Sequence, residues 1–330
     1  MSYQPPFDIT PAILNQVSLI SEKVGELSVK ERFLSPQLRK TNQIKTITGT
    51  LRIEGNSLTE SQVSAILDGK RVLGSVLELA EVQGAISAYE QLNQFDATCV
   101  EDFLKTHDLL MGDVLKNSGK FRSQSVGIHQ GKKVIHVAPS AHKVSGLIAD
   151  LLVWLKNSEH HPLITSSVFH YELEFIHPFM DGNGRMGRLW QTLILSRWKP
   201  VFQYLPLESI IHDHQQDYYQ ALGQADEEAN ATPFITFMLN AILQTIEKNA
   251  LVNASVNAPV NLKGMKTTEA ILALVAQRSS ITRKEMAQWI GKDLRTISRA
   301  IKQLQEQGLL NRVGSDKTGH WVLVLRSQFE

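Results

Sequence analysis

The chain of 330 residues has a single cysteine, Cys99, which excludes an intrachain disulfide and a cysteine-ligated metal cluster. It has no run of about 18 apolar residues and no apolar N-terminal stretch, so we expect neither a membrane span nor a signal peptide. A Gly-x-x-x-x-Gly-Lys-(Ser/Thr) phosphate loop is also missing. Because 42% of the residues are hydrophobic, the chain can still build a sizeable core. We therefore expect a soluble, cytoplasmic protein of about two domains.

Charge is divided unevenly along the chain. Residues 262–330 contain 12 Lys and Arg against 6 Asp and Glu, whereas the remainder contains 22 against 27. Apolar residues recur at helical spacing through most of the sequence, most clearly over residues 144–155, and this spacing predicts a mainly α fold. Residues 251–264 are short, polar and interrupted by Pro259, which predicts a linker before a basic C-terminal module.

The most informative segment is the run His177-Pro-Phe-Met-Asp-Gly-Asn-Gly-Arg-Met-Gly-Arg188. Apolar residues recur at helical spacing before the run, over residues 163–176, and after it, over 184–198. The run is therefore predicted to be a loop between two helices, with its glycines at the start of the second helix. A helix N-terminus offers unpaired N–H groups and a positive dipole end, and both stabilise an anion. Arg185 and Arg188 are three residues apart, so we expect them to clamp phosphate oxygens from one face of the first turn.

The glycines between 182 and 187 also fit the Gly-x-Gly-x-x-Gly pattern of dinucleotide-binding folds. That pattern is informative only when it follows a strand within a strand-helix-strand unit. Here it follows a helical segment that ends in His-Pro-Phe, and no parallel-sheet alternation comes after it. A dinucleotide-binding fold is therefore excluded, and the remaining alternative for the run is an interhelical turn with solvated arginines.

The run resembles the signature of the Fic family, His-x-Phe-x-(Asp/Glu)-Gly-Asn-Gly-Arg-x-x-Arg, at every fixed position. The likeness extends upstream to Gly119-Lys-Phe-Arg-Ser and His161-Pro, and it covers residues from about 75 to 245. Most Fic proteins transfer AMP from ATP to a Ser, Thr or Tyr hydroxyl of a protein. The resemblance thus implies a protein adenylyltransferase that uses ATP and Mg²⁺, modifies a protein partner and itself, and in many relatives forms a homodimer.

The resemblance also implies a role for each motif residue. His177 is the general base that takes the proton from the target hydroxyl, as an imidazole with an ordinary pKa near ~6.5 can do at neutral pH. Asp181 holds the magnesium ion, which prefers one or two carboxylates together with phosphates. The other members bind ATP: Gly182, Asn183 and Gly184 at the α- and β-phosphates, and Arg185 and Arg188 at the β- and γ-phosphates.

An inhibitory segment is predicted upstream. Thr50-Leu-Arg-Ile-Glu54-Gly resembles the (Ser/Thr)-x-x-x-Glu-(Gly/Asn) inhibitory helix that many Fic proteins carry. Thr50 and Glu54 are one helical turn apart, and Gly55-Asn56 is a plausible helix end. In the family the glutamate pairs with the second arginine of the motif, here Arg188, and withholds it from the γ-phosphate. The alternative is a helix end with a solvated carboxylate.

Two short β-branched runs around Gln130-Gly131-Lys132 predict a hairpin over residues 125–137. In the Fic family such a hairpin is a flap that pairs with the backbone of the target. Its residues Ile128, His129, Gln130 and Gly131 are then expected nearest the nucleotide. Downstream, Tyr218 resembles the residue that closes the adenine side of the nucleotide pocket. Tyr219 is the second candidate for this contact. The family often has Asn eight positions after the first tyrosine, where this chain has Asp226.

Other titratable residues are predicted to have structural roles. We expect His170, Glu172 and Glu174 to be packing and surface groups of the helix before the motif. His212 and His214 lack the spacing of a zinc site and are interpreted as surface residues.

The C-terminal module is predicted to contain a helix at 281–291, a turn at 293–296 and a second helix at 296–307. A hairpin follows, with two apolar runs around Gly-Ser-Asp-Lys-Thr-Gly. This order resembles a winged helix-turn-helix domain. Its second helix directs outward the residues that would contact a partner, which are Arg295, Thr296, Ser298, Arg299 and Lys302. The net charge is modest, and winged helices also dock proteins, so DNA and protein remain equal alternatives.

Taken together, the sequence predicts a mainly α protein: a Fic-type helical bundle with a small β-hairpin flap, plus a winged-helix domain. The expected divisions are a helical region with the inhibitory helix at 1–74, a Fic domain at 75–250, a linker at 251–264 and the winged helix at 265–330. The expected activity is AMP transfer restrained by Glu54. The alternatives are AMP removal, transfer of a phosphate or another nucleotide, and a transcription regulator with a vestigial catalytic domain. Phosphate-transferring relatives generally have a different residue at the position of Gly184, whereas this chain has the usual glycine there.

Overall fold

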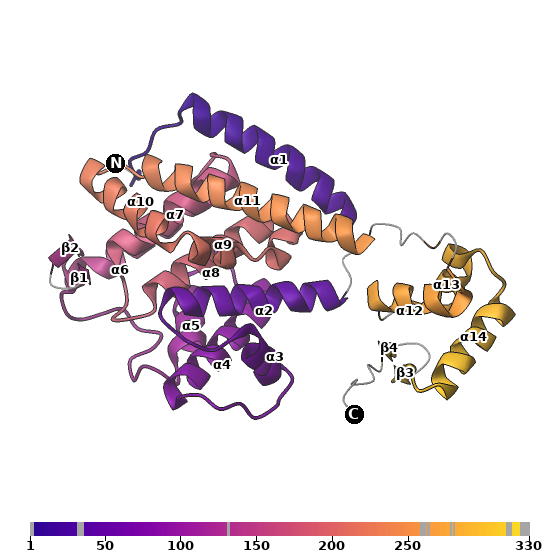
Figure 1. Ribbon diagram of the computed structural model, residues 1–330. Helices are drawn as coiled ribbons and strands as arrows, with labels where there is room; N and C mark the ends of the chain where they lie inside the picture. The colour runs from indigo at the N-terminus through magenta and orange to yellow at the C-terminus, as the bar shows by residue number, and fades with distance from the viewer. Residues whose placement is uncertain are drawn as a thin grey trace. The chain divides into compact units, whose positions relative to one another are not determined.

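Figure 1 shows the computed structural model, which describes residues 3–31, 36–130, 133–257, 262, 265–277, 279, 281–314 and 319–323. The chain forms two compact units, residues 1–249 and 250–330, and each has its own hydrophobic core. None of the helices in these ranges is both long and apolar enough to cross a membrane. The strands form two antiparallel pairs, so the described residues contain no parallel sheet of the kind that a dinucleotide-binding fold requires.

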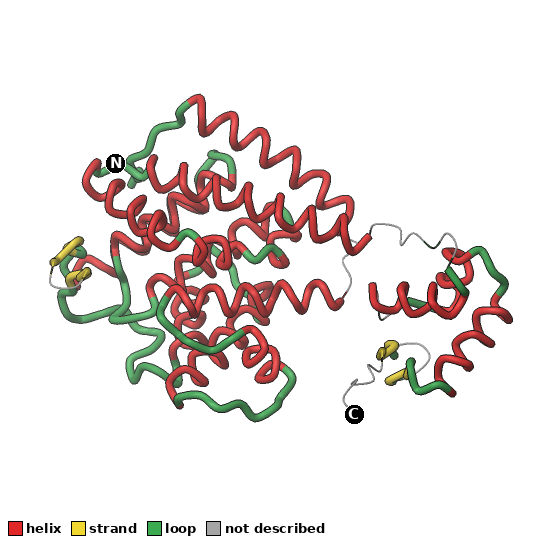
Figure 2. The backbone as a smooth tube through the Cα atoms, viewed as in Figure 1, coloured by secondary structure: helices red, strands yellow, loops and turns green. Residues whose placement is uncertain are grey.

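The first unit is almost entirely helical (Figure 2). Its elements are α1 (Pro11–Glu31), α2 (Pro36–Ile53), α3 (Glu60–Leu67), α4 (Val76–Glu90), the 3-10 turn η1 (Leu92–Gln94), α5 (Val100–Met111), β1 (Gly127–Gln130), β2 (Lys133–Val137), α6 (Ala141–Asn157), α7 (Pro162–Ile176), α8 (Asn183–Trp198), the 3-10 turn η2 (Pro200–Tyr204), α9 (Leu207–Asp213), α10 (Gln215–Glu228) and the start of α11 (Thr232–Asn257). The prediction of a mainly α bundle with one small hairpin is confirmed.

Helices α7 and α8 lie side by side and are buried on nearly all sides. Such a helix, with Val168, Phe169 and Leu173 all buried in α7, is stable only when neighbouring elements cover it. The two helices approach closely at Gly187, where a Cβ would lie 2.5 Å from Cδ2 of His170. The loop that joins them, residues 177–182, is therefore anchored at both ends by the core.

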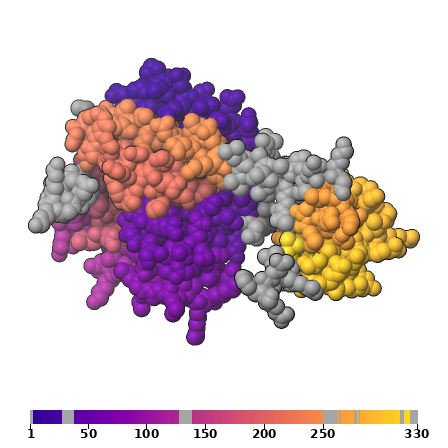
Figure 3. Space-filling view, in the orientation of Figure 1, coloured from indigo at the N-terminus to yellow at the C-terminus, as the bar shows by residue number. Residues whose placement is uncertain are grey.

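Helix α2 packs against α9 closely enough that its C-terminal end reaches the first turn of α8. A Cβ at Gly49 would lie 2.7 Å from the carbonyl carbon of Glu208, so only glycine fits this crossing. Nδ2 of Asn42 donates to Oδ1 of Asn249 in α11 at 2.9 Å. Figure 3 shows α1, α11 and the α2–α4 region as neighbours on one face of this unit. Residues 1–74 therefore belong to the same compact unit as α7 and α8.

The second unit contains α12 (Thr267–Gln277), α13 (Arg283–Ile290), α14 (Leu294–Glu306), β3 (Leu310–Val313) and β4 (His320–Leu323). The strands pair antiparallel, with Leu310 opposite Leu323. Trp321 anchors the hairpin to the helices because its indole Nε1 donates to the carbonyl of Ile281 at 2.8 Å and its ring is buried. The element order, helices followed by a hairpin, is the one expected from the sequence.

Two elements differ from the sequence-based expectation. Helix α11 continues to Asn257, so the first seven residues of the predicted linker are helical. Helix α3 was not predicted, since eight residues are too few to show a clear period. A capping box between Thr59 and Gln62 starts it.

Gly84 marks the contact between α4 and α5. A Cβ here would overlap the backbone carbonyl oxygens of Leu109 and Leu110, which cannot rotate away. We expect Gly84→Ala to lower the melting temperature by several degrees, because overpacking of this kind costs about 1–3 kcal/mol. The matched control is Gly146→Ala in α6, where nothing lies within 4 Å of the added Cβ and alanine is favoured by about 1 kcal/mol. Equal melting temperatures for the two variants would contradict this packing.

Candidate active site

The loop between α7 and α8 is held by Arg122, a buried residue whose role the sequence does not reveal. Its Nε donates to the carbonyl of His177 at 2.7 Å, and Nη2 donates to the carbonyls of Pro139 and, at 3.3 Å, Ile176. The N–H of Arg122 donates to the carbonyl of Pro178 at 2.9 Å. Hydrogen bonds from a charged donor are stronger than neutral ones. One guanidinium thus fixes the entry to the loop.

His177 ends α7 in the left-handed region, with φ 50° and ψ 62°. A non-glycine residue seldom adopts this conformation, which costs about 1 kcal/mol or more and persists only where the surroundings enforce it. Its N–H donates to the carbonyl of Leu173 at 2.9 Å, and its carbonyl accepts from Arg122. The residue as a whole is half-buried, while its Nδ1 atom is buried.

The side chain of Asn183 holds the loop closed instead of facing outward. Its Oδ1 accepts the N–H of Phe179 at 2.9 Å, and its Nδ2 donates to the carbonyl of Phe179 at 3.0 Å. Asn183 is 2% exposed. Oδ1 and one of the two Nδ2 hydrogens of Asn183 are thus bonded to the backbone of Phe179. The predicted contact of Asn183 with the α- and β-phosphates stays a prediction.

The first turn of α8 has no side-chain cap, but Oε1 of Glu54 lies beside it, 2.6 Å from where a Cβ at Gly184 would be. Gly182 is its N-cap, with φ 82°, and no side chain caps the turn. A Cβ at Gly182 would lie 2.9 Å from Sδ of Met111, so a side chain fits here only if Met111 moves. His107 supports the turn from below. Its Nδ1 accepts the N–H of Gly119 at 2.9 Å, so Nε2 carries the proton and donates to the carbonyl of Asp181 at 3.0 Å.

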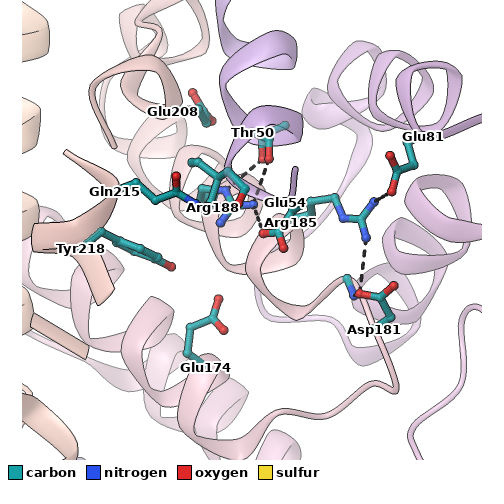
Figure 4. Close-up of polar contacts among 12 residues, drawn as sticks. Thr50, Glu54, Glu81, Glu174, Asp181, Arg185, Arg188, Glu208, Gln215 and Tyr218 are labelled. Atoms are coloured by element: carbon teal, nitrogen blue, oxygen red, sulfur yellow. Dashed lines mark hydrogen bonds and ion pairs between the residues drawn. The ribbon is translucent and has the colours of Figure 1, made fainter. Parts of the chain in front are cut away.

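Arg188 lies in α8, and its guanidinium is bonded to the C-terminal end of α2 (Figure 4). Nε donates to Oγ1 of Thr50 at 2.9 Å, and Nη2 donates to the carbonyl of Thr50 at 3.2 Å and to Oε1 of Glu54 at 2.6 Å. Arg188 is 2% exposed, whereas the Glu54 side chain is 29% exposed. Burial acts to lower the pKa of Arg188, but the adjacent Glu54 carboxylate outweighs it and raises the pKa above its ordinary value.

Helix α2 ends as the sequence predicts. Its last helical residue is Ile53, and Gly55 follows with φ 90°. The N–H of Gly55 donates to the carbonyl of Arg52, and the N–H of Asn56 donates to the carbonyl of Leu51. Glycine suits this left-handed position after a helix end. The turn projects Glu54 from the end of α2 toward Arg188.

Arg185 points away from Arg188 toward α4 (Figure 4). Its Nη1 donates to Oε1 of Glu81 at 3.0 Å, and Nη2 lies 3.4 Å from Oδ1 of Asp181. The guanidinium groups of Arg185 and Arg188 therefore point in different directions, each toward a different carboxylate. This corrects the expectation that the two arginines hold phosphate oxygens from one face of the helix. Glu81 is a site residue that no motif of the sequence indicates.

Two more carboxylates surround Arg188. Glu208 of α9 accepts from the hydroxyl of Tyr89 at 2.9 Å, and burial raises its pKa. Glu174 of α7 lies with Oε1 3.7 Å from Nε2 of His170. Burial opposes its charge, but His170 and Arg188 outweigh burial and lower its pKa. Figure 4 shows the carboxylate directed toward the space between Tyr218 and Glu54. The prediction of a packing or surface group for Glu174 is corrected, since it faces the site.

The comparisons with known proteins agree with this geometry. The Fic/DOC family profile matches residues 97–195, which contain the whole run from His177 to Arg188. The chain is also similar to the crystal structure of a Fic family protein from Desulfovibrio desulfuricans G20. The TM-score is 0.77 and the identity 41%, covering 99% of this chain and 100% of that one. The chain belongs to the Fic family.

Curated relatives carry the name protein adenylyltransferase Fic. The protein of Nematostella vectensis is 30% identical over 208 residues, which cover 59% of this chain and 46% of the relative. That of Drosophila ananassae is 30% identical over 222 residues, or 63% of this chain and 42% of the relative. This chain therefore spans less than half the length of these relatives. Fic-1 from C. elegans shares the fold, with a TM-score of 0.61 and 24% identity over 74% of this chain and 73% of that one.

The hairpin and α10 flank this Fic motif. Ile128, His129 and Gln130 lie in β1, whose pairing with β2 is irregular between Ile128 and His129, and Gly131 lies outside the described residues. Strand β2 contacts α10. In α10, Tyr218 is buried, and its hydroxyl lies 3.1 Å from Nε2 of His170. Tyr219, the second candidate for the adenine contact, is 43% exposed and is the more accessible of the two rings.

Asp181 is the residue of this site best suited to a metal. Its side chain is 55% exposed, and Oδ1 accepts the N–H of Gly182 at 2.6 Å. Magnesium usually keeps several waters and takes one or two carboxylates together with substrate phosphates. Among the described residues no cluster of three or more His, Cys, Asp or Glu forms a metal cage. A single exposed carboxylate beside an open helix N-terminus fits an ion that arrives with phosphates.

The structural role of Asn183 can be tested in the nucleotide-free protein. Asn183→Leu leaves the N–H and carbonyl of Phe179 buried without their partner, and each such group costs about 1–3 kcal/mol. We therefore expect a clear fall in the melting temperature of the nucleotide-free protein. The control is Asn157→Leu, at the exposed end of α6, whose Nδ2 bond to Val153 is open to solvent. An Asn183 variant as stable as this control would show that the side chain does not hold the loop.

Proposed function

We propose that this protein transfers AMP from ATP to a Ser, Thr or Tyr hydroxyl of a protein, and that it modifies itself as well. The observation that carries the proposal is the N-terminal turn of α8, which has no side-chain cap and directly follows the loop that carries His177 and Asp181. The names of the curated relatives support the same reaction. Phosphoryl-type transfer depends mainly on positioning and charge stabilisation, and this turn supplies both.

In this mechanism the hydroxyl oxygen of the target attacks the α-phosphorus of ATP. The hydroxyl proton passes to the imidazole of His177, the bond from the α-phosphorus to the bridging oxygen breaks, and pyrophosphate leaves. The backbone N–H groups of Asn183 and Gly184 bind the α- and β-phosphates, and that of Gly182 joins them once it releases Oδ1 of Asp181. Asp181 would hold Mg²⁺, which would neutralise phosphate charge. The strained backbone of His177, fixed by Arg122, keeps the imidazole in place.

The hairpin positions the target in this proposal. Strands β1 and β2 pair only with each other in the described residues, so an extended segment of a target can add as a further strand. Backbone pairing of this kind brings a hydroxyl toward His177 with little demand on the target's sequence. The residues from Ile128 to Gly131 are then the nearest to the nucleotide. ATP enters between the hairpin and α10, with its adenine against Tyr218 or Tyr219.

Glu54 restrains the reaction because it competes with the γ-phosphate for Arg188. Both groups are anions, and the guanidinium already donates to Oε1 of Glu54 at 2.6 Å. A Cβ at Gly184 would lie 2.6 Å from the same oxygen, so the carboxylate stands directly over the first turn of α8. While Glu54 is there, the γ-phosphate cannot reach Arg188 and ATP binds in a pose that does not react. Arg185 would also have to release Glu81 or Asp181 to contact phosphate.

Removal of AMP from a modified protein is the second candidate. It is favoured by the 29% exposure of the Glu54 side chain, which leaves a carboxylate in contact with solvent beside the phosphate-binding turn. Such a carboxylate can orient a water molecule for attack on the α-phosphorus. The two reactions depend on Glu54 in opposite directions, because transfer is restrained by the carboxylate and removal requires it.

His177 tests the assignment of the base. We expect His177→Ala to lower AMP transfer by about 10²–10⁴-fold, since a general base contributes roughly this much. ATP binding and the melting temperature should change little, because the imidazole acts only on the attacking hydroxyl. Incorporation of labelled AMP and a thermal melt measure the two effects. Wild-type AMP transfer by this variant would contradict the role of His177 as the general base.

Glu54 tests the restraint and separates the two reactions. We expect Glu54→Gly to raise AMP incorporation by about tenfold or more, since a hydrogen bond to a charged group contributes about 1.5–3 kcal/mol. Adding Arg188→Ala should abolish that gain. The control is Glu90→Gly, which removes an exposed glutamate from the end of another helix. If Glu54→Gly instead stops AMP removal from a premodified target without raising transfer, removal is the main activity.

A further inference from the structure

The second unit contains a helix-turn-helix. Helix α13 begins at a capping box between Thr282 and Glu285 and ends at Gly291, which has φ 70°. A turn of three residues, 291–293, leads to α14, where the side chain of Asp293 accepts the N–H of Thr296 at 2.9 Å. Two helices joined by a short turn that contains glycine are the arrangement by which many proteins place the second helix in the major groove of DNA.

Helix α14 has two chemically distinct faces. Its inward face is apolar and consists of Ile297, Ala300, Ile301 and Leu304, all buried in the core of this unit. The outward face carries Arg295, Arg299 and Lys302, which are all exposed, with Ser298 between them. The cations are four and three residues apart, so they follow one line along the helix. Thr296 is not part of this line, because its hydroxyl donates to Asp293 at 2.8 Å. Its predicted role as a partner contact is corrected.

The positive charge of this unit is not neutralised by its own acids. Among the described residues of the unit there are four acidic side chains, and three of them serve helix starts: Glu269 accepts from Lys266, Glu285 from Thr282 and Asp293 from Thr296. The fourth, Glu306, lies 3.8 Å from Lys302. Arg295 and Arg299 therefore face solvent with no acid within ion-pair distance among these residues. The exposed Arg283, Lys284 and Lys292 flank them on α13 and the turn.

We propose that the outward face of α14 binds double-stranded DNA in the major groove. The groove is about 12 Å wide and admits an α-helix, and arginine can donate two hydrogen bonds to guanine at its floor. Arg295 and Arg299 are placed to reach base edges, while Lys302 and the cations of α13 and the turn reach phosphates. A protein partner fits this line of cations less well, because the cores of protein interfaces are depleted in charge. The large apolar side chains exposed near it are Leu294, at the start of α14, and Trp289, on α13.

The experiment measures binding of the full-length chain to a labelled mixed-sequence duplex by fluorescence anisotropy over a salt series. Each phosphate contact lowers the slope of log K against log salt by about 0.9. We expect Arg295→Ala/Arg299→Ala to weaken binding by about tenfold or more at low salt, since a well-placed bidentate arginine discriminates by roughly 1–3 kcal/mol. The matched control is Lys70→Ala/Arg71→Ala, which removes two exposed cations from the first unit.

The control double variant should bind like wild type, and all variants should melt at the wild-type temperature because the altered side chains are exposed. His177→Ala should also bind DNA normally, so this result is independent of AMP transfer. Absence of duplex binding by the wild type at about 50 mM salt overturns the proposal and leaves a protein as the partner of this face. Equal weakening by the two double variants also overturns it, since binding would then follow net charge and not α14.

Discussion

The buried guanidinium of Arg188 is the group on which the arrangement of the first unit depends. An arginine taken out of water is costly unless its N–H groups are bonded and its charge is balanced. Thr50 of α2 and Glu54, just beyond the last residue of α2, satisfy these demands, together with the electrostatic effect of Glu174. Helix α2 must therefore pack against the body of the unit, and the absence of a side chain at Gly49 permits this.

The partners of Arg188 differ in how easily they can leave. Thr50 is fully buried in α2, and Glu208 is buried in α9, so these groups stay in place as long as the unit is folded. Glu54 lies beyond the last residue of α2, after which the chain turns at Gly55, and its side chain reaches solvent. An anion from solution can therefore replace Glu54 without unfolding α2. This difference in burial is what makes one ion pair exchangeable and suits it to regulation.

The motif loop is held mainly by bonds to its backbone. Arg122, Asn183 and His107 each bond backbone atoms of the segment 176–181, and all three side chains are buried. The consequence is that the N–H groups at the start of α8 point outward in a fixed geometry, which is the arrangement that stabilises charge on a phosphate with little reorganisation. Packing holds the fixed Phe of the motif as well, because Phe103 stacks on Phe179.

Local patterns in the sequence were enough to predict most of the helices, the interhelical position of the motif, the end of α2 before Gly55 and the helix-turn-helix order, because helical spacing and the turn preferences of glycine are local properties. They missed α3 and the helical start of the predicted linker. The sequence could not show that Asn183 turns inward, that Arg185 and Arg188 diverge, or that Glu81, Glu174 and Arg122 border the site. These outcomes depend on which helices lie next to α8. A buried polar group bonds to whatever partner packing brings within reach, and packing joins residues that are more than a hundred positions apart, such as Glu54 and Arg188.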